Sequence, residues 1–138
     1  MREFFESRIT EGRGSVERLL NAPVLRFDSR LRGLLPDSHG IYRIFEIEEE
    51  PFRTLRAGRT KRAVEGLRQR VYQNHFQGDQ TGNIRAQLVR AGRCQSSEAA
   101  KAFLRERCAV QILVIEDEAE RKWAEHFMLA VLRPDESH

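Results

Sequence analysis

The sequence predicts one α/β domain, of the α+β kind, in which helices flank a small three-stranded and mainly antiparallel sheet. The chain has 138 residues, enough for one domain with a buried core and too few for two ordinary domains. Three short segments, residues 40–47, 52–58 and 108–115, have the β-branched and aromatic content that is typical of strands. The first two follow each other closely and predict a hairpin. Helical segments separate them from the third, which must join the sheet across helices.

The N-terminal part is expected to be helical. Apolar residues at helical spacing predict a helix or a frayed arm over residues 1–20. Turn signals then bracket a short apolar stretch and a second helix at 29–35. We therefore expect residues 1–37 to form a helical extension packed on the core, residues 38–134 to form the core, and residues 135–138 to be a tail.

Hydrophobic patterning defines the remaining elements of the core. Apolar residues on both faces of 40–47 predict that the sheet is covered on both sides, and the acidic run 48–51 predicts the hairpin loop. Helices are predicted over 61–76 with Thr60 as N-cap, over 84–91, from Ser96 or Ser97 to Arg107, and over 116–132.

Composition excludes several classes of protein. The apolar run 109–115 is far shorter than the ~20 residues that a membrane-spanning helix needs, and the N-terminus lacks the apolar segment of a secretory signal. Cys94 and Cys108 lack the C-x-x-C and histidine spacings of a zinc site, and they do not indicate a disulfide framework. We expect a protein without a membrane partner, located in the reducing cytoplasm, including the nucleoid.

Positive charge is concentrated in one third of the chain. Residues 51–95 contain ten Lys or Arg and two acidic residues, a net charge of +8, so the rest sums to −5 because the whole chain carries +3. Such a concentrated field is typical of proteins that bind polyanions. The alternative is a set of arginine-rich helix faces that only meet solvent.

Four motifs occur in a characteristic order: Gly40-Ile41-Tyr42, Arg56-Ala57-Gly58, Leu67-Arg68-Gln69-Arg70, and Glu125 nine residues before Pro134. On a strand, a strand, a helix and the last helix, they resemble a GIY-YIG nuclease domain over about residues 38–134. The resemblance implies a small standalone bacterial member of that family. It also implies a metal-dependent endonuclease, using Mg²⁺ or Mn²⁺, that hydrolyses phosphodiester bonds of DNA.

The resemblance also implies roles for individual residues. Tyr42 would position or activate water, Arg70 with help from Arg59 would stabilise charge on the scissile phosphate, and Glu125 would be the protein ligand of the metal. The residue types suit these roles, because a phenol can move a proton once nearby cations lower its pKa, and Mg²⁺ takes few carboxylates. The alternatives are a core tyrosine at position 42 and a salt-bridged carboxylate at position 125.

Two positions depart from the family pattern. Arg56 stands where the family has its second tyrosine, and an arginine cannot act as a base although it can hold a phosphate bidentately. Family members often have an arginine and a histidine four residues apart on one flank of the helix. Asn74 is four residues after Arg70, and His75 comes one residue late. His75 therefore reaches the site only if the last turn loosens; otherwise it bonds the final carbonyls of the helix.

Glu125 also stands out without the family. Apolar residues lie on every side of the last helix, and a helix of that kind is buried. An ionised carboxylate in such a place is costly without a partner or a metal.

DNA, including structured or single-stranded nucleic acid, is the expected partner. The expected contacts are Arg56, Arg62, Arg68, Arg85 and Arg90. Residues 78–83 are either a contact loop or a plain turn. Two other functions stay open: a nucleic-acid-binding module that keeps the fold without catalysis, and an adaptor that binds an acidic protein.

Overall fold

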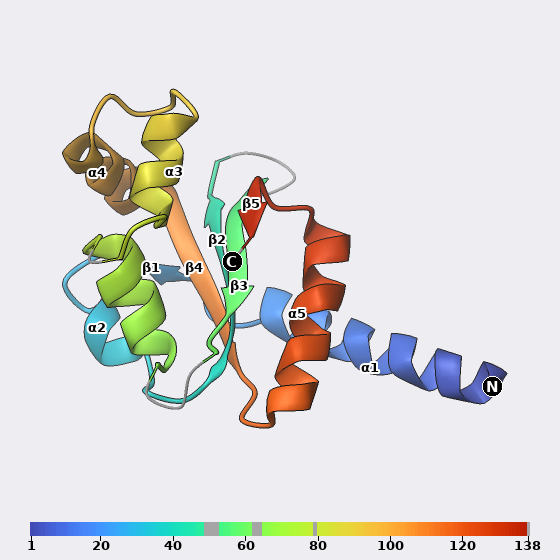
Figure 1. The fold of residues 1–138 in the computed structure, drawn as a ribbon. Coiled ribbons are helices and arrows are strands. Elements are labelled where there is room, and N and C mark those ends of the chain that lie inside the picture. The colour runs from blue at the N-terminus through green and yellow to red at the C-terminus, as the bar shows by residue number, and fades with distance from the viewer. Residues whose placement is uncertain (49–52, 62–64, 79, 138) are drawn as a thin grey trace.

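The computed structural model describes residues 1–48, 53–61, 65–78 and 80–137, and its strands form one sheet (Figure 1). The strands are β1 (Leu25–Arg26), β2 (Gly40–Glu46), β3 (Arg53–Arg59), β4 (Cys108–Val114) and β5 (Glu136–Ser137), in the order β1-β4-β2-β3-β5. All neighbours are antiparallel except β3 and β5. The expected three long strands are present in the centre. The expected strand count was wrong because a two-residue strand is added at each edge.

Helices cover both faces of the sheet, as the pattern of 40–47 predicted. Every residue of β2 is buried. Tyr42 and Ile44 face a cluster that includes residues of the helices α2 (Leu31–Leu34), α3 (Ile84–Arg90) and α4 (Ser97–Arg107). Ile41 faces a second cluster, which includes residues of α1 (Arg2–Leu20) and α5 (Glu118–Leu132). This division into two faces follows from the alternation of side chains along a strand.

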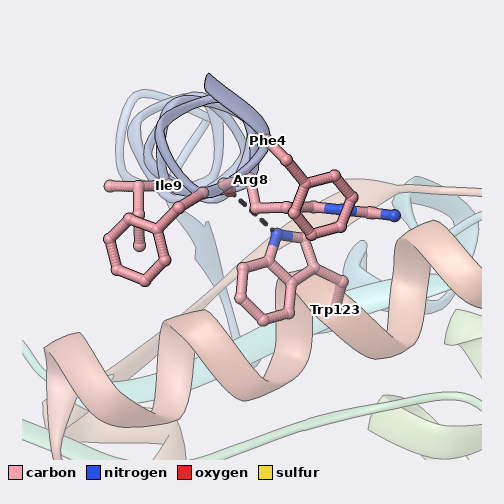
Figure 2. A pocket seen from close by; sticks show the side chains of 5 residues that line it. Phe4, Arg8, Ile9 and Trp123 are labelled. Carbon is pink, nitrogen blue, oxygen red and sulfur yellow. Dashed lines mark hydrogen bonds between the residues drawn. The ribbon is translucent and has the colours of Figure 1, made fainter. Parts of the chain in front are cut away.

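The long helix α1 packs against α5 and β4 through its second half. A side chain at Gly12 would place its Cβ 2.6 Å from the Phe127 ring, so the two helices approach closely only because this residue is a glycine. The first half projects past the core (Figure 1), and Phe4 and Phe5 are 60% and 65% exposed. There the Trp123 indole donates a hydrogen bond to the Arg8 carbonyl (3.1 Å), at an open apolar hollow (Figure 2).

Three helices begin at residues whose side chains cap them. One expectation for α5, however, was wrong. The side chains of Asn83, Ser96 and Asp117 accept hydrogen bonds from the backbone N–H three residues later, as N-caps do. The helix α5 is not buried all round. Val131 is 52% exposed, and the buried residues Arg121, Ala124, Glu125 and Met128 form one stripe.

The predicted α-helix over 61–76 is a shorter π-helix, η1 (Arg68–Phe76). Thr60 does not cap it; the buried Thr60 hydroxyl accepts a hydrogen bond from the Gly40 N–H (3.1 Å) instead. In a π-helix the backbone bonds join residues five apart, and two side-chain pairs with that spacing are hydrogen-bonded, Gln69 with Asn74 and Gln77 with Tyr72.

Some sequence expectations fall on residues outside the described ranges. They are most of the hairpin loop 48–51, residues 62–64 at the start of the predicted helix, and Arg62 as a nucleic-acid contact. Among the described helices, none combines the length and the apolar character that crossing a membrane requires.

Candidate functional site

Tyr42 lies at the centre of the candidate site, fully buried on the face of β2 opposite to α5. Register pairs Tyr42 with Gly58 of β3, and a Cβ at Gly58 would lie 3.0 Å from the Tyr42 hydroxyl. Burial raises the pKa of Tyr42 to about 12, although the charges of Arg70 and Arg56 oppose this shift. Tyr42 is therefore a neutral phenol at physiological pH and not a ready general base.

His75 is hydrogen-bonded to Tyr42, with 2.9 Å between His75 Nε2 and the Tyr42 oxygen. The backbone N–H of Ile84 donates to His75 Nδ1 (3.1 Å). A backbone N–H can only donate, so Nδ1 is the acceptor, and the proton of the neutral ring lies on Nε2. Nε2 then donates to the Tyr42 oxygen. The hydroxyl proton of Tyr42 is thereby left to point toward another acceptor.

The π-helix brings His75 and Arg70 to one cavity. On an α-helix a residue five positions after Arg70 would lie off its flank, but five is the repeat of the π-helical hydrogen bond. A cavity of about 210 Å³ is lined by Arg56, Arg70, His75 and the loop residues Gln80, Thr81, Gly82 and Asn83. The condition set by the sequence, a loosened helix that lets His75 reach the site, is thus met by π winding.

Two buried guanidinium groups face this cavity with donors to spare. Arg56 donates to the Gln87 side chain (3.2 Å) and to the Gly82 carbonyl (2.8 Å), and Arg70 is paired with Glu65. In the described part of the chain the Nε atoms of Arg56 and Arg70 are buried without a hydrogen-bond partner. Burial lowers the pKa of Arg56, and the nearby Arg70 charge adds to this. An unpaired buried donor costs about 1–3 kcal/mol, and the positive charge of the two groups at the cavity suits an anion.

Arg59 and Glu125 form a second, separate part of the site. Strand alternation places Arg59 with Ala57 on the face that α5 covers. There Arg59 is paired with Glu125, which is only 4% exposed. His126 Nε2 lies 4.0 Å from the same carboxylate. The salt-bridge alternative for Glu125 is therefore the state that the structure contains. The negative charge of Glu125 nevertheless helps to raise the pKa of Tyr42.

Glu125 can be the ligand of a divalent ion only if part of its carboxylate is available. Mg²⁺ keeps most of its waters and takes one or two carboxylates with phosphate oxygens, which one buried glutamate can satisfy. Within the described ranges no three His, Cys, Asp or Glu side chains gather as a metal cluster. Arg59 occupies Oε1 of this carboxylate, so an ion must displace that guanidinium or bind through Oε2.

Several expected nucleic-acid contacts have structural partners. Arg85 was expected on the phosphate-tracking surface, and this is wrong. It is buried and donates to the Phe76 carbonyl (3.0 Å), to Ser97 and to Glu98 (3.0 Å), which ties the end of η1 to α4. Arg68 donates to Asp37 (3.0 Å) and to the Arg32 carbonyl (2.9 Å). Arg90 is paired with Glu136.

Sequence reasoning missed three residues that shape the cavity. Glu65 precedes Arg70 by five residues. Residues with this spacing do not lie on the same flank of an α-helix, so the sequence did not indicate the pair. Gln87 accepts from Arg56 and donates to the Leu55 carbonyl (2.8 Å), which fixes the Arg56 side chain. Glu136 belongs to the expected tail and yet reaches Arg56 (3.5 Å). The acidic pair at 135–136 is the one sequence signal that could have indicated it, as a partner for the basic segment 51–95.

Comparisons with protein-family models, with curated proteins and with solved structures found no match for this chain.

Proposed function

We propose that the chain binds the phosphodiester backbone of DNA in the Arg56–Arg70 cavity and cleaves it as a metal-dependent endonuclease of the GIY-YIG kind. The observation that carries the proposal is the cavity itself. Two buried guanidinium groups with unpaired Nε donors line it together with a histidine that is bonded to Tyr42. Arginine is the usual ligand of phosphate, because its planar fork matches two phosphate oxygens.

In this proposal Arg70 and Arg56 hold the scissile phosphate and stabilise the charge that develops on it. Arg56 contributes a second guanidinium where the family pattern has a tyrosine. The pocket thus gains charge for binding and loses one group that could move a proton.

Tyr42 and His75 act as a positioning pair. With His75 Nε2 donating to its oxygen, the buried Tyr42 holds the ring of His75, which lines the cavity. A pKa of about 12 makes Tyr42 a donor and not the base that deprotonates water.

Glu125 would hold Mg²⁺ or Mn²⁺ once Arg59 leaves the carboxylate for a phosphate. The ion would supply Lewis-acid stabilisation of the leaving oxygen. Arg59 is 19% exposed in its side chain, so an incoming phosphate can compete for it.

The test is a cleavage assay with purified protein in excess over labelled plasmid, flap, bubble and single-stranded substrates, in Mg²⁺ or Mn²⁺. Cleavage of at least one substrate that is lost in Arg70→Ala is the expected result. Binding without cleavage of any substrate would leave the second candidate.

That second candidate is a nucleic-acid-binding module without catalysis. It is favoured by the Arg59–Glu125 pair, which neutralises the proposed metal ligand, and by the complete burial of Tyr42. Titration with Mn²⁺, followed by electron paramagnetic resonance in the presence of DNA, separates the two. A bound ion that disappears in Glu125→Gln supports the endonuclease, and no bound ion supports the binding module.

A further inference from the structure

Two arginines of β3 and one of the neighbouring α3 are each paired with a carboxylate from residues 135–136. Arg53 lies 3.0 Å from Asp135, Arg56 lies 3.5 Å from Glu136, and Arg90 of the neighbouring α3 is paired with Glu136 as well. We call Arg53, Arg56 and Arg90 the edge arginines. Arg56 also lines the cavity of the candidate site, so the edge arginines adjoin this cavity.

The carboxylates come from a segment with little other support. The strand β5 pairs with β3 over two residues, Glu136 with Arg56 and Ser137 with Ala57, and the Asp135 N–H donates to the Thr54 carbonyl (3.1 Å). Figure 1 shows β5 as a short strand beside β3 at the edge of the sheet. Asp135 is exposed and Glu136 half-buried. The segment therefore depends on a few backbone bonds and on ion pairs, which contribute little when solvent reaches them.

We propose that the edge arginines are a second nucleic-acid subsite, which binds phosphodiesters next to the one in the cavity, and that residues 135–137 fill it when nucleic acid is absent. A carboxylate and a phosphodiester both offer two oxygens that share a negative charge, and arginine binds both in the same way. Asp135 and Glu136 thus take the place of two phosphates. This inference rests on the proposed function, because it extends the same binding surface.

Competition between residues 135–137 and a nucleic-acid strand lowers the observed affinity for nucleic acid. A tethered segment acts at a high effective concentration, and the apparent dissociation constant rises by the inverse of the fraction that is open. Because half-exposed ion pairs are weak, removing both carboxylates should increase affinity by about threefold to tenfold.

The experiment uses fluorescence anisotropy of a labelled 20-nucleotide single-stranded oligothymidine, at low salt without divalent ions. The variant is Asp135→Asn/Glu136→Gln. The matched control is Glu3→Gln/Glu106→Gln, which removes the same two charges from exposed positions on α1 and α4. We expect a threefold to tenfold gain in the first variant and less than a twofold gain in the control. Adding Arg90→Ala to the first variant should abolish the gain.

Hydrogen exchange gives an independent measurement on the wild-type protein. The Asp135 amide should be protected in the free protein and should exchange faster when the oligothymidine is bound. Equal gains in both double variants, or an unchanged affinity in the Asp135/Glu136 variant, would overturn the subsite while binding itself remains. If the wild type does not bind the oligothymidine or labelled duplex DNA, the proposed function fails as well.

Discussion

Replacing Glu125 with glutamine separates the role of this residue in folding from its role in chemistry. The substitution keeps the shape and one acceptor oxygen and removes the charge that faces Arg59. A hydrogen bond to a charged group contributes about 1.5–3 kcal/mol. Because the glutamine oxygen still accepts and Arg59 is partly exposed, we expect Glu125→Gln to lower the free energy of unfolding by about 1–2 kcal/mol. This corresponds to a fall in Tm of about 3–6 °C for a chain of this size.

Urea unfolding measures this change through the fluorescence of Trp123, which lies on the same helix. Glu118→Gln is the matched control, because Glu118 is exposed in the first turn of α5; it should cost less than about 1 kcal/mol. In buffer without divalent ions, DNA affinity of Glu125→Gln should equal that of the wild type or exceed it slightly, since Arg59 is released. If the chain is the proposed endonuclease, cleavage should fall by at least about a hundredfold, because the proposed ion loses its protein ligand.

Two results would refute this reasoning. A folded Glu125→Gln protein that cleaves at the wild-type rate would make Glu125 a structural partner of Arg59 alone. A loss of more than about 3 kcal/mol would mean that the pair behaves as a fully buried one, and that the site is less accessible than the exposure of Arg59 suggests.

Three further substitutions test the core of the site. Tyr42→Phe should cost about 0.5–1.5 kcal/mol through the lost bond to His75. Because the pKa of Tyr42 is raised in the folded state, the stability that its neutral hydroxyl contributes is fully present below about pH 10 and is lost as the pH rises through about 12. Between these pH values the free energy of unfolding should therefore depend less on pH in the variant. Gly58→Ala should destabilise by about 1–3 kcal/mol because its Cβ meets the Tyr42 hydroxyl, whereas Gly14→Ala, with open space around it, should be neutral or stabilising in urea unfolding. Arg85→Ala should unfold more easily by about 2 kcal/mol or more, and its DNA affinity, measured where it is folded, should match the wild type.

Much of the fold was accessible from sequence because its signals are local. The strands 40–47 and 108–115 differ from β2 and β4 only at their ends, and Ser96 caps its helix as predicted. The edge strands β1 and β5 were missed because two residues are too few for a periodic pattern. Their pairing depends on a neighbouring strand that is distant in sequence.

The candidate site was harder to predict because its geometry depends on tertiary contacts. Nothing local marks a π-helix; the turn before it is held by bonds from the Leu67 and Arg68 amides to the carbonyls of Ser38 and Pro36. Arg85 looked like a surface cation because arginine is mostly exposed in proteins, but its long side chain crosses the interior to reach carbonyl groups. The Arg59–Glu125 pair was foreseen only as an alternative, since sequence spacing cannot show which arginine meets a carboxylate.

The π winding of η1 also bears on how this helix tolerates changes in length. A hydrogen-bonded ring that spans five residues contains one residue more than its α-helical counterpart. Removing one residue between Arg70 and His75, for example the half-buried Gln73, would leave these two side chains four positions apart, the α-helical repeat. A helix wound in this way can gain or lose a residue by changing its winding, while the groups that line the cavity keep their places. For the residues of η1, equivalence with another helix is therefore better defined by the cavity they line than by their numbering.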